Sequence, residues 1–181
     1  CRGSQEGHVV TSLIHSQGAA DCGPRVQHTL RDRGDELLAE LAAKVVLATD
    51  LQLPLARRDE VRDRLIDFCT SRLVRYLLAT DQVLYSVAAG AAETRLLVRA
   101  LRAQHDLVAV RIAEVKRADS SAEFAASARA LVASLEVCHH VEQEVLIPAL
   151  AALPGADLSV LAGDRDVLLA GRTLNAPEVL D

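Results

Sequence analysis

Apolar residues recur at alternating three- and four-residue steps over most of this chain, which is the spacing of one face of an α-helix. The clearest stripe, from Thr94 to Val115, has the regular spacing of a heptad repeat. The same periodicity predicts four long helices and one short helix, over about residues 26–49, 57–89, 93–117, 121–153 and 157–170. Turn-forming residues separate them, at Pro54, at Gly90 and at the pair Pro154 and Gly155.

Four long amphipathic helices joined by short links predict an all-α fold. We expect an up-down-up-down four-helix bundle with a short extra C-terminal helix, formed as one domain by residues 25–171. Residues 1–24 are weakly patterned and contain Gly and Ser, which predicts a loosely structured leader. Residues 172–181 are expected to form a polar tail.

Composition narrows the classes of function. Hydrophobic residues make up 50% of the 181 residues, yet there are only two Tyr, two Phe and no Trp, which favours helices over a β-sandwich. The net charge of -5 at pH 7 predicts no nucleic-acid partner. No apolar run approaches the roughly 18 residues of a membrane span, so no membrane partner is expected.

Cysteine content and motifs bear on location and chemistry. Four Cys do not make a disulfide scaffold in a chain of this size, so we expect free thiols and a cytoplasmic protein. No phosphate-binding loop, serine nucleophile elbow or Cys-x-x-Cys motif indicates a class of enzyme. The Ala-rich outer faces of the helices would permit a homodimer.

Several polar residues occupy stripe positions that should face the core: Tyr76, Thr80, His105, Cys138 and Glu142. Each lies near the middle of its helix, so an antiparallel bundle would bring them to similar heights. A buried carboxylate such as Glu142 is costly unless it is paired or binds a metal. Cys138 and Glu142 are four residues apart, so they point to one side of one helix and can share an ion. Together with His105 they predict a Cys/His/carboxylate metal site.

Ordinary structural explanations stand beside this hypothesis. A single His on an apolar stripe is commonly a hydrogen-bonded core residue, and a single Cys is most often a small buried apolar side chain. Glu142 is harder to explain in this way, although an inward-reaching Arg would satisfy it. His139 flanks the stripe and could turn inward as a further ligand. Cys69, two turns before Tyr76, is as consistent with a packing role as with a reactive thiol. Gly34 leaves space in the core and supplies no metal ligand.

The segments that carry these residues resemble the hemerythrin-like family, also called the HHE cation-binding family. The strongest similarity is in SLEVCHHVEQEVLIPALAALPG, where the family typically has Leu-x-x-His, then Glu-Asn-Glu, then Leu-Leu-x-Pro-Ala-Leu and a Pro-Gly turn. Weaker similarity is found in DELLAELAAKV, FCTSRLVRYLLATDQVLYSVAA and LLVRALRAQHDLVAV. The resemblance covers about residues 30–170, and it implies a four-helix bundle with a non-haem iron site in its middle.

The resemblance transfers only part of the family's ligand set. His105 stands at a ligand position of the third helix and Glu142 at the carboxylate of the fourth. Cys138 stands where the fourth helix should offer His, while Tyr76 and Thr80 replace a His and a Glu of the second helix. A two-iron centre needs more ligands than remain. The resemblance therefore implies one iron ion, or a zinc ion, rather than a di-iron site.

The first of three functional hypotheses is a remodelled mononuclear site of non-haem iron or zinc. Its ligands would be His105, Cys138 and Glu142, with Tyr76 or water completing the set. An open position would permit binding of a small molecule such as O2 or NO, or a response to redox conditions.

Two other hypotheses need no metal. A metal-free hemerythrin-like bundle could bind a small molecule or a protein, using the space left by Gly34. A thiol switch could form between Cys69 and Cys138, provided that their Cα atoms lie within about 7 Å of each other.

Overall fold

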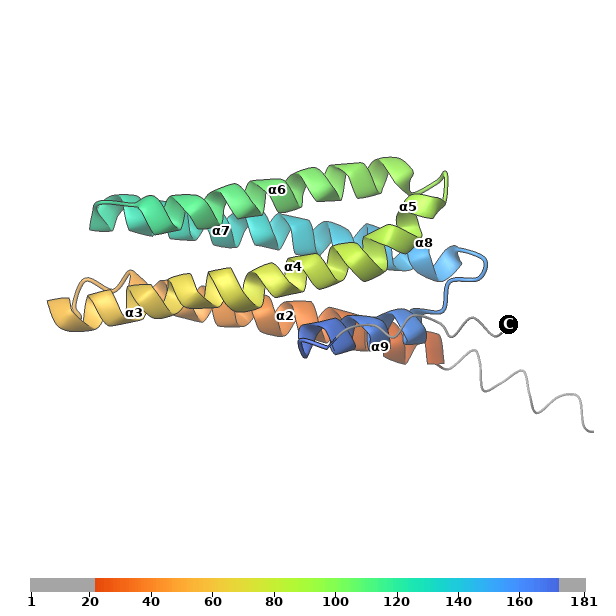
Figure 1. Cartoon of the computed structure of the whole chain (residues 1–181), viewed down its shortest axis with the longest axis horizontal. Helices are drawn as coiled ribbons and strands as arrows, with labels where there is room; N and C mark the ends of the chain where they lie inside the picture. Colours follow the sequence, from red (N-terminus) through yellow and green to blue (C-terminus); the bar gives the residue numbers. More distant parts are fainter. Residues whose placement is uncertain (1–21, 173–181) are drawn as a thin grey trace, which may run out of the picture.

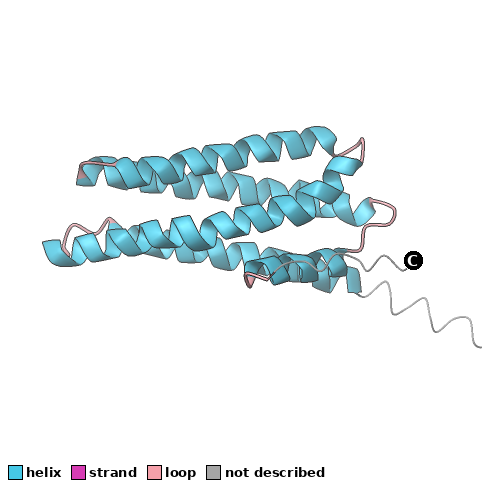
Figure 2. Cartoon of the chain, viewed as in Figure 1, coloured by secondary structure: helices cyan, strands magenta, loops and turns pink. Residues whose placement is uncertain are grey.

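The computed structural model describes residues 22–172. All regular secondary structure in this range is helical, and no strand occurs in it (Figure 2). Residues 1–21 of the predicted leader and residues 173–181 of the predicted tail lie outside the described range. The predicted leader boundary at residue 24 is corrected, because the first described helix already begins at Cys22.

The long helices lie side by side as a bundle (Figure 1). Their bounds are α2 Cys22–Ala48, α3 Leu55–Phe68, α4 Val74–Thr80, α5 Ser86–Gly90, α6 Arg95–Arg117, α7 Ser121–Val141, α8 Ile147–Ala152 and α9 Leu158–Leu169. Within the bundle α6 packs along α7, α2 contacts both α3 and α7, and α9 packs against α2 and α4. None of the helices in the described part of the chain combines the length and the apolar character needed to cross a bilayer.

Three π-helical segments join shorter helices into continuous ones: η1 Cys69–Leu73, η2 Asp81–Tyr85 and η3 Glu142–Leu146. Through η1 and η2, the helices α3, α4 and α5 follow one another without a break. Through η3, α7 runs on into α8. The predicted helices over 57–89 and 121–153 therefore appear in the structure, with π turns inside them.

The π turns change which side chains face inward. Three- and four-residue steps continued from Val83 and from Glu142 predict buried positions at Val87 and Val145, but these residues are 38% and 49% exposed. The buried positions are instead the next residues along, Ala88 and Leu146, both fully buried. A π turn holds more residues per turn than an α turn, so the stripe moves by one position after η2 and after η3.

Local sequence explains the helix ends. Ser120 caps α7, because its hydroxyl accepts a hydrogen bond from the Glu123 amide at 3.1 Å. The Glu123 carboxylate in turn accepts from the Asp119 amide at 3.1 Å. Pro24 lies in the first turn of α2, where its missing N–H is not needed. Gly155 has a φ of +82° in the turn after α8, a conformation that favours glycine.

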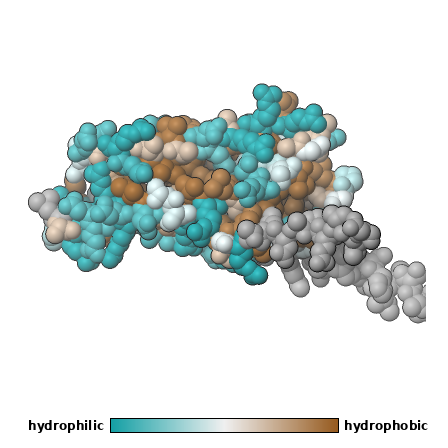
Figure 3. Space-filling model, in the orientation of Figure 1, coloured by the Kyte–Doolittle hydropathy of each residue, from teal (hydrophilic) through white to brown (hydrophobic). Residues whose placement is uncertain are grey.

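Buried apolar side chains form two groups. The first core cluster includes Leu41, Leu65, Cys69, Leu73, Tyr76, Val108, Ile112, Leu131 and Leu135. The second core cluster includes Leu30, Val83, Leu84, Tyr85, Val98, Leu101, Cys138, Leu146, Ile147 and Leu150. In the space-filling view, apolar surface is also visible between helix α6 and helix α4. Hydrophilic side chains flank it on both sides (Figure 3).

Candidate metal centre

Three potential metal ligands from facing helices converge inside the bundle. His105 comes from α6, Cys138 from α7 and Glu142 from the start of η3, and their ligand atoms all lie within 4.8 Å of one another. The His105 Nε2 atom is 3.3 Å from Glu142 Oε1, and the Cys138 Sγ atom is 3.8 Å from the same oxygen. Cys138 and Glu142 are buried, whereas His105 is partly exposed.

Helix geometry accounts for this convergence. Cys138 and Glu142 are one turn apart at the junction of α7 and η3, so both side chains point to the same side. His105 lies near the middle of α6, which packs along α7 and so presents the imidazole to that pair. The three side chains therefore lie at one height in the bundle.

Tyr85 is a fourth polar residue at this centre, and it is not among the site residues predicted from the sequence. Its hydroxyl donates a hydrogen bond to Glu142 Oε1 and lies 3.0 Å from His105 Nε2 and 3.9 Å from Cys138 Sγ. The Tyr85 and His105 rings are 4.9 Å apart between centroids. Tyr85 is the last residue of η2. It is nine residues after Tyr76 and so lies off the stripe that includes Tyr76, which is why the stripe gives no signal for it.

The surroundings keep two of these groups protonated when no metal is bound. Burial raises the pKa of the Cys138 thiol far above its usual range, and the nearby Glu142 charge raises it further. Burial, followed by the Glu142 charge, raises the pKa of the Tyr85 hydroxyl in the same direction. Both groups therefore act as donors to Glu142 at neutral pH. A metal would have to displace the thiol proton to bind sulfur.

The donor set fits a single ion. Ligands held tetrahedrally at about 2.0–2.3 Å from one metal lie roughly 3.3–3.7 Å from each other. The separations of 3.3 Å and 3.8 Å are close to that range, and the remaining pair, His105 and Cys138, lies within 4.8 Å. Imidazole and thiolate suit zinc or iron, and the carboxylate is compatible with either metal.

His139 is buried, but it lies apart from these three donors. Its Nε2 atom is 2.7 Å from Asp35 Oδ1, and its Nδ1 atom is 3.5 Å from Gln143 Nε2. A Cβ added at Gly34 would come within 2.1 Å of the His139 ring. The imidazole therefore fills the space at Gly34 that the metal-free hypothesis assigned to a ligand.

Tyr76 is likewise placed away from the three donors. Its side chain is buried, and its hydroxyl has no hydrogen-bond partner among the described residues. A Cβ at Gly34 would lie 2.9 Å from this hydroxyl, which locates it beside α2. Tyr85, rather than Tyr76, supplies the phenol that touches His105 and Glu142.

Cys69 belongs to a different part of the core from Cys138. Cys69 is fully buried in the first core cluster among residues such as Leu65 and Leu73, whereas Cys138 lies in the second. Burial raises the pKa of the Cys69 thiol to about 12. Both thiols are free, and the Cys69 thiol makes no hydrogen bond among the described residues.

A cavity leads from the surface to the partly exposed side of this centre. It has a volume of about 370 Å³ and lies between α4, η2 and α6, with His105 in its lining. Its walls include the apolar side chains of Leu77 and Leu78. An ion pair between Arg102 and Asp81, 2.6 Å apart, also lines the cavity. A small molecule could therefore approach His105 from solvent without passing through the core.

Comparisons with protein-family models, with curated proteins and with solved structures gave no match for this chain.

Proposed function

We propose that this chain is a hemerythrin-like, up-down-up-down four-helix bundle that holds one non-haem metal ion, iron or zinc. The observation that carries the proposal is the convergence of His105, Cys138 and Glu142 at ligand spacing within the bundle. The short connections between successive long helices, together with the sequence resemblance, support the topology.

Energetics favour an ion at this position. Glu142 is only 3% exposed, and no Arg or Lys forms an ion pair with it in the described part of the chain. A buried carboxylate without a cation pays a large desolvation cost, which a bound metal would offset. When bound, the metal would supply Lewis acidity and, if it is iron, one-electron redox chemistry.

Three protein donors leave room for a further ligand. In a tetrahedral set the remaining position is available to water or to a small molecule such as O2 or NO. The cavity lined by Leu77, Leu78 and His105 provides the approach. The Tyr85 hydroxyl donates its proton to Glu142 and lies 3.0 Å from His105 Nε2, so its oxygen is placed to accept a hydrogen bond from a water molecule beside the imidazole. These features support a small-molecule binding or sensing function.

The direct test is elemental metal analysis of tag-free protein purified without added metal, together with a visible spectrum of the same sample. We expect about one iron or zinc ion per chain, and we expect Cys138→Ser and Glu142→Gln to lose it. Cys69→Ser is the matched control and should keep the metal. Protein that stays empty after anaerobic incubation with Fe(II) and then with Zn(II) would overturn the proposal.

A metal-free function has one specific observation in its favour. Tyr85, His105 and Cys138 all lie within hydrogen-bonding reach of Glu142, so the polar groups can satisfy one another without an ion. A protein of this kind would show the same melting temperature before and after treatment with a chelator. A bound metal predicts a drop, because a ligand that binds only the folded state stabilises it.

A further inference from the structure

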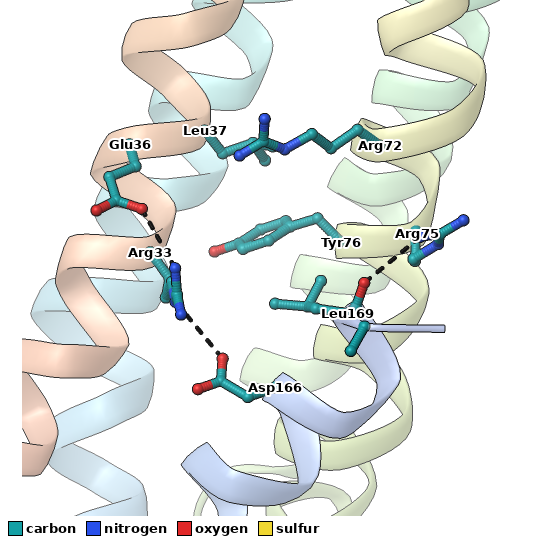
Figure 4. A pocket seen from close by; sticks show the side chains of 9 residues that line it. Arg33, Glu36, Leu37, Arg72, Arg75, Tyr76, Asp166 and Leu169 are labelled. Atoms are coloured by element: carbon teal, nitrogen blue, oxygen red, sulfur yellow. Dashed lines mark hydrogen bonds and ion pairs between the residues drawn. The ribbon is translucent and has the colours of Figure 1, made fainter. Parts of the chain in front are cut away.

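A second cavity lies between α2, α4 and α9 (Figure 4). Its volume is about 390 Å³, and neither His105 nor Cys138 is among its lining residues. Leu37 and Leu169 provide apolar wall, while Tyr76 extends across the gap from α4 toward α2. The proposed metal centre makes no use of this cavity.

Cationic side chains dominate the polar part of its lining. Arg33 extends from α2, Arg72 from η1 and Arg75 from α4. Two carboxylates, Glu36 and Asp166, share the same lining. Arg72 forms an ion pair with Glu40, which is not part of the lining, so Arg33 and Arg75 are the guanidinium groups available to an anionic ligand.

Arg33 and Arg75 have N–H donors that their neighbours do not fully use. Arg33 lies 3.5 Å from Glu36 and 3.6 Å from Asp166, longer than the roughly 2.7–2.9 Å of a well-formed charge-assisted hydrogen bond. Arg75 forms no ion pair within residues 22–172, and its one hydrogen bond, to the Leu169 carbonyl, is 3.5 Å long. Both groups could bind a carboxylate or a phosphate more closely than they bind their present partners.

Tyr76 supplies an independent indication of a ligand. The residue is only 4% exposed, and its hydroxyl is without a hydrogen-bond partner in the described structure. A buried donor that lacks an acceptor costs free energy, so such groups are rare in folded proteins. The Arg165 guanidinium, 5.6 Å from the ring centroid, helps to hold the ring in place, so the hydroxyl is presented in a fixed position.

We propose that this cavity binds a small organic anion, a carboxylate or a phosphate monoester that carries a short apolar chain. The acidic group would accept hydrogen bonds from Arg33, Arg75 and the Tyr76 hydroxyl. The apolar chain would lie against Leu37 and Leu169. This site is separate from the metal centre and does not depend on the metal proposal.

The test is calorimetric titration of the whole chain with hexanoate and with hexyl phosphate, and with hexanol as the uncharged control. Saturable binding of at least one acid, with no binding of hexanol, is expected. The acid that binds more tightly then identifies the carboxylate or the phosphate monoester as the ligand class. Arg75→Ala and Tyr76→Phe should each weaken that binding about tenfold, because each removes a hydrogen bond to a charged group.

Arg57→Ala is the matched control. Arg57 is an exposed arginine of α3 that pairs only with Glu60 and does not line the cavity, so its loss should leave the affinity unchanged. Absence of saturable binding by either acid would overturn the proposal, and so would equal affinities in Arg75→Ala, Tyr76→Phe and the unaltered chain. Circular dichroism of each variant confirms that it is folded.

Discussion

The two buried cysteines of the core have opposite surroundings. Cys69 lies in the first core cluster, among leucine and valine side chains, and its thiol makes no hydrogen bond in the described structure. Cys138 lies in the second, 3.8 Å from Glu142 Oε1 and 3.9 Å from the Tyr85 hydroxyl. Both thiols have their pKa raised by burial, so burial alone does not distinguish them. The polar neighbours do, and they make Cys138 the candidate for chemistry and Cys69 a packing residue.

The first and second core clusters are expected to contribute differently to stability and to metal binding. The first core cluster contributes chiefly apolar burial, which stabilises the fold by about 25 cal/mol for each Å² removed from water. The second core cluster includes groups whose burial is costly unless they are paired. We therefore expect substitutions in the first cluster to change stability and substitutions near Cys138 to change metal binding.

The largest effect should come from a cavity in the first core cluster. Leu65→Ala removes a fully buried side chain of α3 and should lower the free energy of unfolding by about 3 kcal/mol. Urea denaturation of the metal-free protein measures this change. The metal content per folded chain should stay the same, because Leu65 belongs to the first core cluster and Cys138 to the second. A loss of metal at full folding would show that the two regions are coupled.

Substitution of the two cysteines tests the comparison directly. Cys138→Ser replaces a thiolate donor and should weaken metal binding by about a hundredfold or more. Cys69→Ser should leave the metal affinity unchanged and lower the free energy of unfolding by about 1–3 kcal/mol, because its hydroxyl would lie in apolar surroundings.

Competition with a chromogenic chelator measures both metal affinities. Equal losses of affinity in the two cysteine variants would contradict the division between the core clusters.

Much of the fold follows from sequence periodicity, and the exceptions have a physical cause. The stripe spacing predicts every long helix of the described range to within a few residues. It fails at Val87 and Val145, which are exposed, because periodicity assumes a uniform helix and takes no account of η2 and η3. The stripe pattern does not reveal the π turns, which appear only in the backbone of the folded chain.

The three candidate metal ligands could be predicted from the sequence, but the neighbouring tyrosine, Tyr85, could not. His105, Cys138 and Glu142 could be identified because each places a polar group where the pattern demands an apolar one. Tyr85 is nine residues after Tyr76, about half a turn away from it on a straight helix, so the stripe that includes Tyr76 excludes it. In the structure Tyr76 faces α2 and α9, while Tyr85 faces α6 and α7.

Metal affinity should fall as the pH is lowered. Burial and Glu142 raise the pKa of the Cys138 thiol, so the metal-free protein carries the thiol proton through the neutral range and the metal-bound protein does not. Acid therefore favours the metal-free form, and each pH unit should lower the affinity about tenfold. Competition titrations with the chelator between about pH 6 and pH 8 measure the slope. In Cys138→Ser the contribution of the thiol proton should disappear, and an unchanged slope would argue against a thiolate ligand.

The smallest effects should come from removing single hydroxyl groups from the two buried tyrosines. Tyr85→Phe removes a donor to Glu142 and should lower the free energy of unfolding of the metal-free protein by about 1 kcal/mol. Tyr76→Phe removes a hydroxyl without a partner in the described structure, so its effect should lie within about 0.5 kcal/mol and could be stabilising. Urea denaturation of both variants in anion-free buffer makes the measurement. A larger loss for Tyr76→Phe than for Tyr85→Phe would reverse the roles of the two tyrosines, because it would mean that the Tyr76 hydroxyl has a strong partner in solution.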